Sequence, residues 1–341
     1  MKSVSVGYIL LGAFCLYALV AVQDLSMLDA APKKSHQGES ASVSGNNSAG
    51  VTLKHAKDSI EILVDGRPFT TYHFVGYNKP IFFPVRAPNG TIITRGFPIV
   101  SDVPGEAKDH PHQKGIWLTH GDVNGVDYWS EGEMTGKIIH RKFDVAKSTS
   151  GVGVLKSENA WTPPSGQAVL REIREVRILS RPNVRIMDFN AQLTALGGEV
   201  KFGDTKEGTF GIRLAQPFSD KEGGRMENSR GGVGEGECWG KPAEWVDYST
   251  RINNETVGIA IFSHPQGFRH PTHWHVRGYC LFAANPFGLH DFYNDKTKDG
   301  SYTLGEGKSL YLRYRVLIHL GTAKEANIAQ EYNTFVRDVK Y

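Results

Sequence analysis

The chain has 341 residues, of which 40% are hydrophobic and 22% are charged, and its net charge is +3 at pH 7. This composition is typical of a soluble globular protein with a sizeable core, and it excludes a disordered or collagen-like chain. Lys and Arg are spread along the sequence, so no basic run indicates a nucleic-acid partner.

Residues 1–22 have the pattern of a signal peptide or an N-terminal anchor. Lys2 precedes an apolar run from Tyr8 to Val22, and this run is shorter than the about 18 residues that a membrane-spanning helix needs. Residues 23–50 are polar and rich in Ser and Gly, which predicts a flexible linker. We therefore expect an exported protein (periplasmic, cell-surface or extracellular) that touches a membrane only through an uncleaved N-terminal segment, with one folded domain over 51–341.

Two dipeptides predict β-hairpins early in this domain. Asp65-Gly66 and Asn89-Gly90 each separate runs rich in β-branched and aromatic residues, and both pairs readily adopt the positive φ angles of a type I′ turn. Further on, apolar residues at every second position predict two strands with one buried face and one face in water. These residues are Met187, Phe189, Ala191, Leu193 and Ala195, followed by Leu312, Tyr314, Val316, Ile318 and Leu320.

Helical spacing occurs near the end of the chain, over residues 322–339. Its apolar stripe consists of Ile328, Ala329, Tyr332, Phe335, Val336 and Val339, and we expect this stripe to cover a sheet. Many strands, frequent turns and a single helix predict an all-β protein, a large antiparallel β-sandwich with one C-terminal helix.

Histidines are concentrated in two windows of the sequence. Eight of the thirteen lie there: His110, His112, His120, His264, His270, His273, His275 and His290. In an extended segment, residues two apart share a face, so either H-x-H pair could bind a metal. Alternatively, single histidines near Pro111 and Pro271 could donate hydrogen bonds to backbone carbonyls in turns.

A third interpretation is a site that binds a polyol and transfers protons. Such a site needs imidazoles and carboxylates to exchange protons, Arg or Asn to hold hydroxyls, and aromatic faces. The candidates are His110, His112, His120, Asp122, Asn124, Glu207, Arg213, Trp274, His275 and Arg277. Glu207 and Arg213 could equally form an ion pair between strands, Trp117, Tyr128 and Trp129 could be core residues, and Asn124 could belong to a turn.

Three segments resemble the DUF6807 family of exported bacterial proteins, which is also labelled PmoA. They are PGEAKDHPHQKGIWLTHGDVNGVDYW, GDTKEGTFGIRLA and HPTHWHVRGYCLFAANPFG. The likeness extends over nearly all of residues 51–341. Two positions depart from the family pattern, because Gln113 stands where a histidine is expected and Gly278 stands where an acid is expected.

The resemblance implies a supersandwich of the galactose mutarotase type, in which His and Glu exchange protons with a bound sugar. We therefore expect a carbohydrate epimerase, lyase or glycoside hydrolase that acts on a carbohydrate or small polar substrate without a cofactor. Glu207 or Asp122 would act as base and His120 or His275 as acid. The substrate would be bound by His110, His112, Asn124, Arg213, Trp274 and Arg277.

Two alternatives stay open at the level of sequence: a non-catalytic glycan-binding or surface module, and a metal-dependent enzyme that uses the H-x-H pairs. Cys238 and Cys280 could form a disulfide or remain buried thiols.

Overall fold

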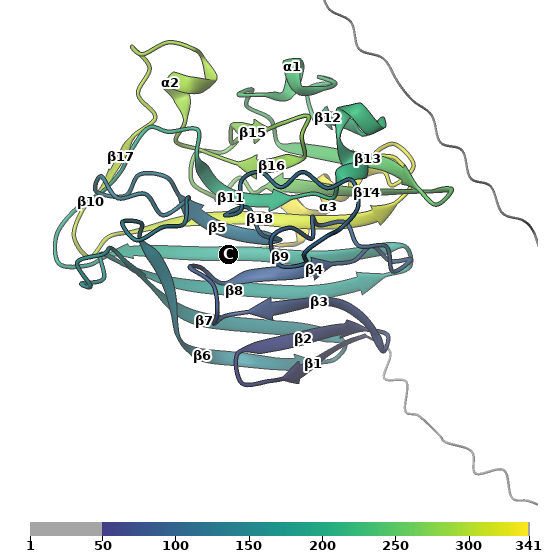
Figure 1. The fold of residues 1–341 in the computed structure, drawn as a ribbon, viewed down its shortest axis with the longest axis horizontal. Helices are drawn as coiled ribbons and strands as arrows, with labels where there is room; N and C mark the ends of the chain where they lie inside the picture. The colour runs from purple at the N-terminus through teal and green to yellow at the C-terminus, as the bar shows by residue number, and fades with distance from the viewer. Residues whose placement is uncertain (1–49, 340–341) are drawn as a thin grey trace, which may run out of the picture. The chain divides into compact units, whose positions relative to one another are not determined.

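A computed structural model describes residues 50–339 and contains two eight-stranded sheets (Figure 1). The first sheet has the order β1 (Val51–His55), β2 (Ser59–Val64), β3 (Arg67–His73), β4 (Ile81–Val85), β5 (Ile116–His120), β11 (Gly208–Arg213), β16 (Leu281–Ala284) and β15 (Trp274–Val276). The second has the order β12 (Arg225–Asn228), β13 (Trp245–Ile252), β14 (Glu255–Ser263), β18 (Ser309–Leu320), β9 (Val184–Ala195), β8 (Leu170–Arg181), β7 (Val152–Thr162) and β6 (Lys137–Thr149). A two-stranded ribbon joins β10 (Val200–Phe202) to β17 (Tyr302–Leu304).

All pairings between these strands are antiparallel. The main core lies between the two sheets and contains the inward side chains of both, including Phe210 of β11 and Phe189 of β9, whose rings are 4.7 Å apart. The predicted all-β sandwich is therefore confirmed. The predictions for the leader and the linker fall on residues outside the described range.

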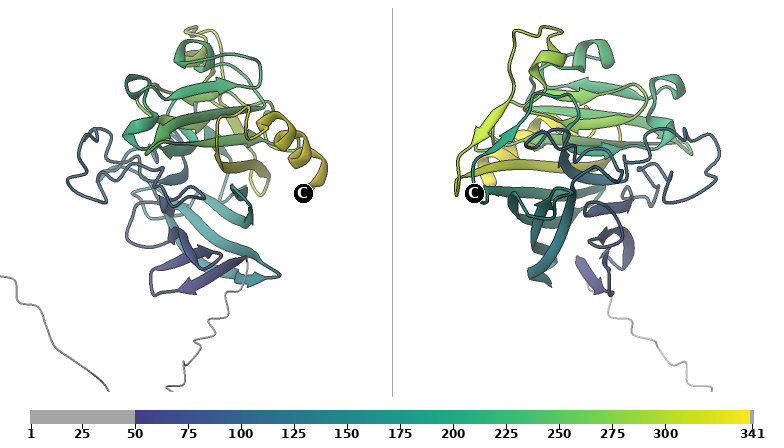
Figure 2. Two further views of the ribbon diagram at one scale, coloured as in Figure 1. Left: turned by 90° about the vertical axis from the view of Figure 1, so that its right-hand side faces the viewer. Right: turned by 60° about the vertical axis from the view of Figure 1, so that its left-hand side comes forward.

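The predicted C-terminal helix is α3 (Ile328–Asp338), which packs on the outer face of the second sheet (Figure 2). Phe335 is fully buried there against Phe262 of β14, whereas Ala329, which was expected in the apolar stripe, is exposed. Shorter elements are α1 (Glu235–Cys238), α2 (Leu289–Phe292) and the 3₁₀ turns η1 (Gln216–Phe218) and η2 (Asp220–Glu222). No helix within residues 50–339 is long and apolar enough to cross a membrane.

The outer face of β18 differs from the expectation of a water-exposed polar face. Arg315 is buried and forms a bidentate ion pair with Asp188 of β9, at 2.6 and 2.8 Å. His319 is fully buried against Asp247 of β13, at 2.7 Å. Polar residues at alternate positions are therefore covered here, because each has an ionic partner on a neighbouring strand.

Strand β6 forms one edge of the second sheet and is the longest strand among the described residues. Its register with β7 shifts twice, between His140 and Lys142 and between Phe143 and Val145.

The outer face of the first sheet carries a second, smaller apolar cluster. It consists of Ile81, Phe83, Trp117, Trp129, Leu281 and Ala283. The loop that precedes β5 brings His110 and His112 to this cluster, with the His112 ring 6.3 Å from that of Trp129.

Candidate functional site

Alternation along two strands selects which predicted residues reach the outer face of the first sheet. In β5, Ile116 and Leu118 point into the main core, so Trp117 points outward. In β15, Trp274 and Val276 point into the core, so His275 points outward. We call the group of polar and aromatic residues around Trp117 and His275 the histidine site.

The centre of the histidine site is an aromatic pair, Trp117 and Trp129. Their ring centroids are 5.3 Å apart, and both side chains are buried. Within the described residues, neither indole Nε1 has a hydrogen-bond partner. The pair is therefore a rigid floor, as expected for core aromatics, but it keeps two donors that water or a ligand could satisfy.

His275 lies beside this floor, with its ring 6.3 Å from that of Trp129 and nearly parallel to it. Its Nδ1 donates a hydrogen bond to the carbonyl oxygen of Lys206, at 2.5 Å. This bond fixes the tautomer in which Nε2 carries the lone pair. Burial, helped by the nearby Arg277 charge, lowers the pKa of His275 to about 3. The imidazole is therefore neutral at physiological pH and presents a proton acceptor.

His112 lies on another side of Trp129, also with a ring separation of 6.3 Å. Burial, together with the charges of Lys79 and His110, lowers the pKa of His112 to about 4. The ammonium groups of Lys79 and Lys114 both contact Glu131, the first at 3.0 Å. Burial alone would raise the pKa of Glu131, but the two lysines hold it below its usual value.

His110 forms a third part of the site, with its ring centroid 5.8 Å from that of His112. Its ring is stacked on Tyr279 at 5.4 Å, and its Nδ1 is 2.9 Å from Asp109. Asp109 also accepts from Arg213 at 2.8 Å. The Arg213 guanidinium lies over the Tyr279 ring, 4.7 Å from its centroid.

Glu207 and Arg277 lie at the margin of the histidine site. Glu207 is partly exposed and pairs with Lys206 at 3.2 Å, so the considered Glu207–Arg213 ion pair is not formed. Arg277 pairs with Glu235 at 2.8 Å and lies 3.7 Å above the ring of Trp239. The charges of His110 and Arg277 act on His275, and those of Glu207 and Arg213 act on the neighbouring Tyr279. The structure thus brings together six predicted residues, namely His110, His112, Glu207, Arg213, His275 and Arg277.

Two other predicted residues, His120 and Trp274, lie in the core instead. His120 has the same parity in β5 as Leu118, so it packs 4.7 Å from Phe287 and donates from Nε2 to the Gly203 carbonyl. Burial lowers the pKa of His120 to about 4. Trp274 is fully buried and donates to the Ala243 carbonyl at 3.0 Å. Neither residue reaches the histidine site.

Asp122 and Asn124 belong to a turn and stabilise it. Asp122 accepts from the Gly125 amide at 2.8 Å, and Asn124 has a positive φ of 54°. The Asn124 side chain accepts from the Lys201 amide in β10, at 2.7 Å. Asn124 therefore lies in a turn, and Asp122 bonds the same turn rather than lying beside His275.

The H-x-H pairs and the cysteines were the remaining candidates. His273 lies beside Phe292 and contacts the Tyr293 hydroxyl at 3.2 Å. Among residues 50–339, no group of three or more His, Cys, Asp or Glu is arranged to hold a metal ion. Cys238 and Cys280 are free, buried thiols, and burial raises the pKa of each to about 12.

The sequence matches the DUF6807 family, described as a family of unknown function, over residues 59–333. The chain belongs to this family. No curated protein sequence matches this DUF6807 protein.

Several solved structures are similar to this DUF6807 protein at a TM-score of 0.35. The galactosidase domain of an α-galactosidase-sucrose kinase is 8% identical and covers 78% of the chain, and a GH36 α-galactosidase from Geobacillus stearothermophilus is 11% identical over 78%. The chain spans only 40% and 39% of those two proteins. A galactose mutarotase-like protein from Clostridium acetobutylicum is 11% identical, with 79% of this chain and 95% of that chain covered.

The sequence did not predict four charged residues of the DUF6807 protein's histidine site, Lys79, Asp109, Lys114 and Glu131, or its aromatic residues Tyr279 and Trp239. Lys79 precedes the apolar strand β4 in the segment NKPIFF, where a buried lysine has no distinguishing signal. Gln113 and Gly278, the two departures from the family pattern, both lie here. Gln113 accepts a hydrogen bond from Arg213, and the Gly278 amide donates to Glu235 at 2.7 Å.

Proposed function

We propose that this protein carries out acid/base chemistry on a sugar at the histidine site, and that the reaction is an epimerisation or an elimination. The observation that carries this proposal is the state of His275. Its Nδ1 is committed to a backbone carbonyl, its imidazole is neutral, and its Nε2 has no hydrogen-bond partner among the described residues. Such a group can accept a proton from a substrate.

The low pKa of His275 does not prevent this role. A conjugate acid with a pKa of about 3 makes the imidazole roughly as basic as a carboxylate, and carboxylates are common catalytic bases. His112, with a pKa of about 4, is a second neutral imidazole on the other side of Trp129. Two proton-exchanging groups around Trp129 favour a reaction in which a proton is removed from the substrate. The proton is then either returned to the same carbon, as in an epimerisation, or not returned while a leaving group departs, as in an elimination.

The carboxylates of the histidine site argue against the two-carboxylate mechanism of glycoside hydrolysis. Asp109 is bonded to Arg95 and Arg213, and Glu131 is bonded to Lys79 and Lys114. These cations keep both carboxylates ionised and occupy their oxygens. Neither carboxylate is therefore suited to protonate a leaving group.

Groups for holding a sugar lie at the margin of the site. Tyr279 is 38% exposed, and Trp239 is half-buried beside His275. Their ring faces already contact His110, Arg213 and Arg277, so the exposed edges of these rings are what a sugar could contact. Glu207 and Arg277 lie next to these rings and can bond hydroxyl groups.

The experiment is proton NMR of a panel of sugars and uronic acids in D₂O with the purified protein. We expect incorporation of deuterium or turnover of at least one compound. The His275→Gln variant should lower the rate by about 10²–10⁴-fold, the range for a general base. His112→Gln and Glu207→Gln show which further groups take part.

His55→Gln is the matched control, because His55 is an exposed residue of β1, at the edge of the first sheet. A rate that is equal in His55→Gln and His275→Gln would contradict the proposed role of His275. Sugar binding without exchange or turnover, unchanged in His275→Gln, would favour the glycan-binding module instead.

A further inference from the structure

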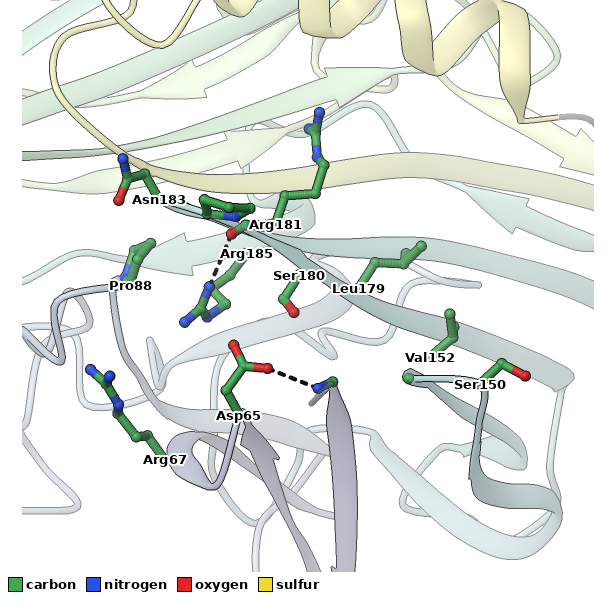
Figure 3. A pocket seen from close by; sticks show the side chains of 13 residues that line it. Asp65, Arg67, Pro88, Ser150, Val152, Leu179, Ser180, Arg181, Asn183 and Arg185 are labelled. Atoms are coloured by element: carbon green, nitrogen blue, oxygen red, sulfur yellow. Dashed lines mark hydrogen bonds between the residues drawn. The ribbon is translucent and has the colours of Figure 1, made fainter. Parts of the chain in front are cut away.

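A cavity of about 590 Å³ lies at one end of the sandwich, where turns of both sheets meet (Figure 3). The β2–β3 turn contributes Asp65 and Arg67, and the β8–β9 turn contributes Arg181 and Arg185. The turn between β6 and β7 closes the side with Ser150. We call this cavity the arginine pocket, and it shares no residue with the histidine site.

The charges of the arginine pocket do not balance. The side chain of Arg181 pairs with Glu331 of α3 at 2.6 Å. Arg185 donates only to backbone carbonyls, those of Val184 at 3.1 Å and Arg181 at 3.3 Å. The backbone of Arg67 pairs with Val64 in the β2–β3 hairpin, but within residues 50–339 its side chain forms no hydrogen bond or ion pair.

Asp65 is the one acidic residue in the wall of the arginine pocket. Its Oδ1 accepts a hydrogen bond from the Gly50 amide at 2.8 Å, and Figure 3 shows this bond beside the Arg185 side chain. Within residues 50–339, Asp65 forms no ion pair with Arg67 or with Arg185. Two guanidinium groups therefore face one cavity without a carboxylate partner.

One of the two unpaired arginines, Arg185, is only partly free to turn toward bulk water, whereas Arg67 is exposed. Arg185 is half-buried, and this burial, with the Arg67 charge, lowers its pKa although Asp65 opposes the shift. A guanidinium that is partly removed from water gains most from an oxyanion, which it can bind through two parallel hydrogen bonds.

Uncharged polar groups complete the lining of the arginine pocket. The side chains of Ser150, Ser180 and Asn183 line it and form no hydrogen bonds with other described residues. Hydroxyl and amide groups of this kind bond the hydroxyls of a ligand. The volume falls in the range of small organic ligands, about 300–1,000 Å³, and exceeds the need of a single inorganic ion.

We infer that the arginine pocket binds a small organic anion that carries hydroxyl groups, an acidic sugar in chemical class. The carboxylate of the sugar would bond Arg67 and Arg185, and its hydroxyls would bond Ser150, Ser180 and Asn183. This inference is independent of the proposed function, because it concerns another part of the molecule.

The test compares galacturonate with galactose, two probes that differ by a carboxylate in place of a hydroxymethyl group. Binding to the full chain is followed by backbone amide shifts in NMR titrations. We expect galacturonate to shift the amides of residues 65–67 and 183–185 and to bind at least 10-fold more tightly than galactose. Its affinity should fall as NaCl rises from about 50 to 300 mM, because salt screens the arginine charges.

Arg67→Gln should weaken galacturonate binding at these amides at least 5-fold, and it should fold normally because Arg67 is exposed. Arg251→Gln removes an exposed charge from β13, outside the pocket, and should leave binding unchanged. His275→Gln should also leave it unchanged, which separates this test from that of the histidine site.

Three results would overturn the inference: equal binding of galactose, no effect of Arg67→Gln, or binding of inorganic phosphate as tight as that of galacturonate. The last result would show a simple anion site in place of a sugar site.

Discussion

Asp109 connects two buried arginines to the histidine loop. One of its oxygens accepts from Arg95 at 2.6 Å and from Arg213 at 2.8 Å, and the other lies 2.9 Å from His110. Arg95 also donates to the carbonyls of residues 107, 109, 110 and 113. Arg95 and the Asp109 carboxylate together therefore hold the segment that carries His110 and His112.

Asp109→Asn should lower the free energy of unfolding by about 1–2 kcal/mol, because it removes the carboxylate bonded to two buried guanidinium groups, although water screens part of this interaction at a carboxylate that is 40% exposed. The measurement is urea denaturation. Asp102→Asn is the control, since Asp102 pairs with Lys108 on the surface and an exposed pair contributes less than about 1 kcal/mol. Equal losses in the two variants would argue against a special role for Asp109.

The two imidazoles of the proposed reaction should stay neutral to low pH. Burial lowers the pKa of His112 to about 4 and that of His275 to about 3, so neither ring should titrate between pH 5 and 8. NMR titration of the histidine ring protons, assigned with His112→Gln and His275→Gln, measures this directly. A midpoint near 6.5 for either ring would mean that it is not desolvated.

Single residues show how far the sequence could predict the site. The alternation of side chains along a strand assigns His120 to the core and His275 to the outer face, but only when the bounds of the strands are known. Lys79 and Glu131 could not be predicted, because they come from separate loops and meet only in the fold. Their pairing has no local sequence signal.

At the level of elements, β5 and β11 fit together through a glycine. A Cβ at Gly211 would lie 2.6 Å from the indole of Trp117, so the residue at position 211 must leave room for the aromatic floor.

Gly211→Ala should therefore destabilise the protein by about 1–3 kcal/mol, the usual cost of overpacking. Thermal or urea unfolding measures the effect. Gly236→Ala is the matched control, because a Cβ there meets nothing within 4 Å and should be neutral. If both variants unfold alike, the close approach at Trp117 has no energetic importance.

The two predicted hairpin turns show the limits of dipeptide signals. Asp65 and Gly66 have φ of 50° and 75°, as a type I′ turn requires. At Asn89-Gly90, only Gly90 has a positive φ, and its amide bonds to Ala87. Pro88 explains the difference, because its ring fixes a negative φ and favours a type I turn.

On the scale of the whole molecule, two layers and the terminal helix could be predicted from periodicity, but the covered outer faces could not. Arg315 and His319 alternate with apolar residues as exposed residues would. They are buried because α3 and the loop before it cover this side of the sheet. Which face is covered depends on contacts between distant segments.

Buried histidines should give the stability a maximum near pH 6.5. Burial lowers the pKa of seven of them below the unfolded value of about 6.5: that of His112, His120 and His273 to about 4, that of His275 to about 3, and those of His73, His140 and His270 as well. Below pH 6.5 the unfolded chain binds more protons, so the free energy of unfolding falls as pH falls.

His319 acts in the opposite direction. Burial opposes its charged form, but the charge and hydrogen bond of Asp247, together with backbone groups of Leu320 and Gly321, raise the pKa of His319. Its contribution is complete below pH 6.5 and is lost as pH rises through the folded-state pKa. Urea titrations from pH 4 to 8.5 measure both slopes, and His319→Gln should remove the loss above pH 6.5. A wild-type stability that rises steadily to pH 8.5 would contradict this assignment.

The shape of β6 has a consequence for behaviour at high protein concentration. An open edge of this length offers unpaired amides and carbonyls to another chain, which is how sheets polymerise. The two register shifts bend this edge, and Lys137 and Lys147 place positive charges along it, whereas Lys142 is paired with Asp144 at 2.9 Å. Copies of the molecule that approach edge to edge therefore meet a kinked, mutually repelling strand, which protects the fold from growing into fibrils.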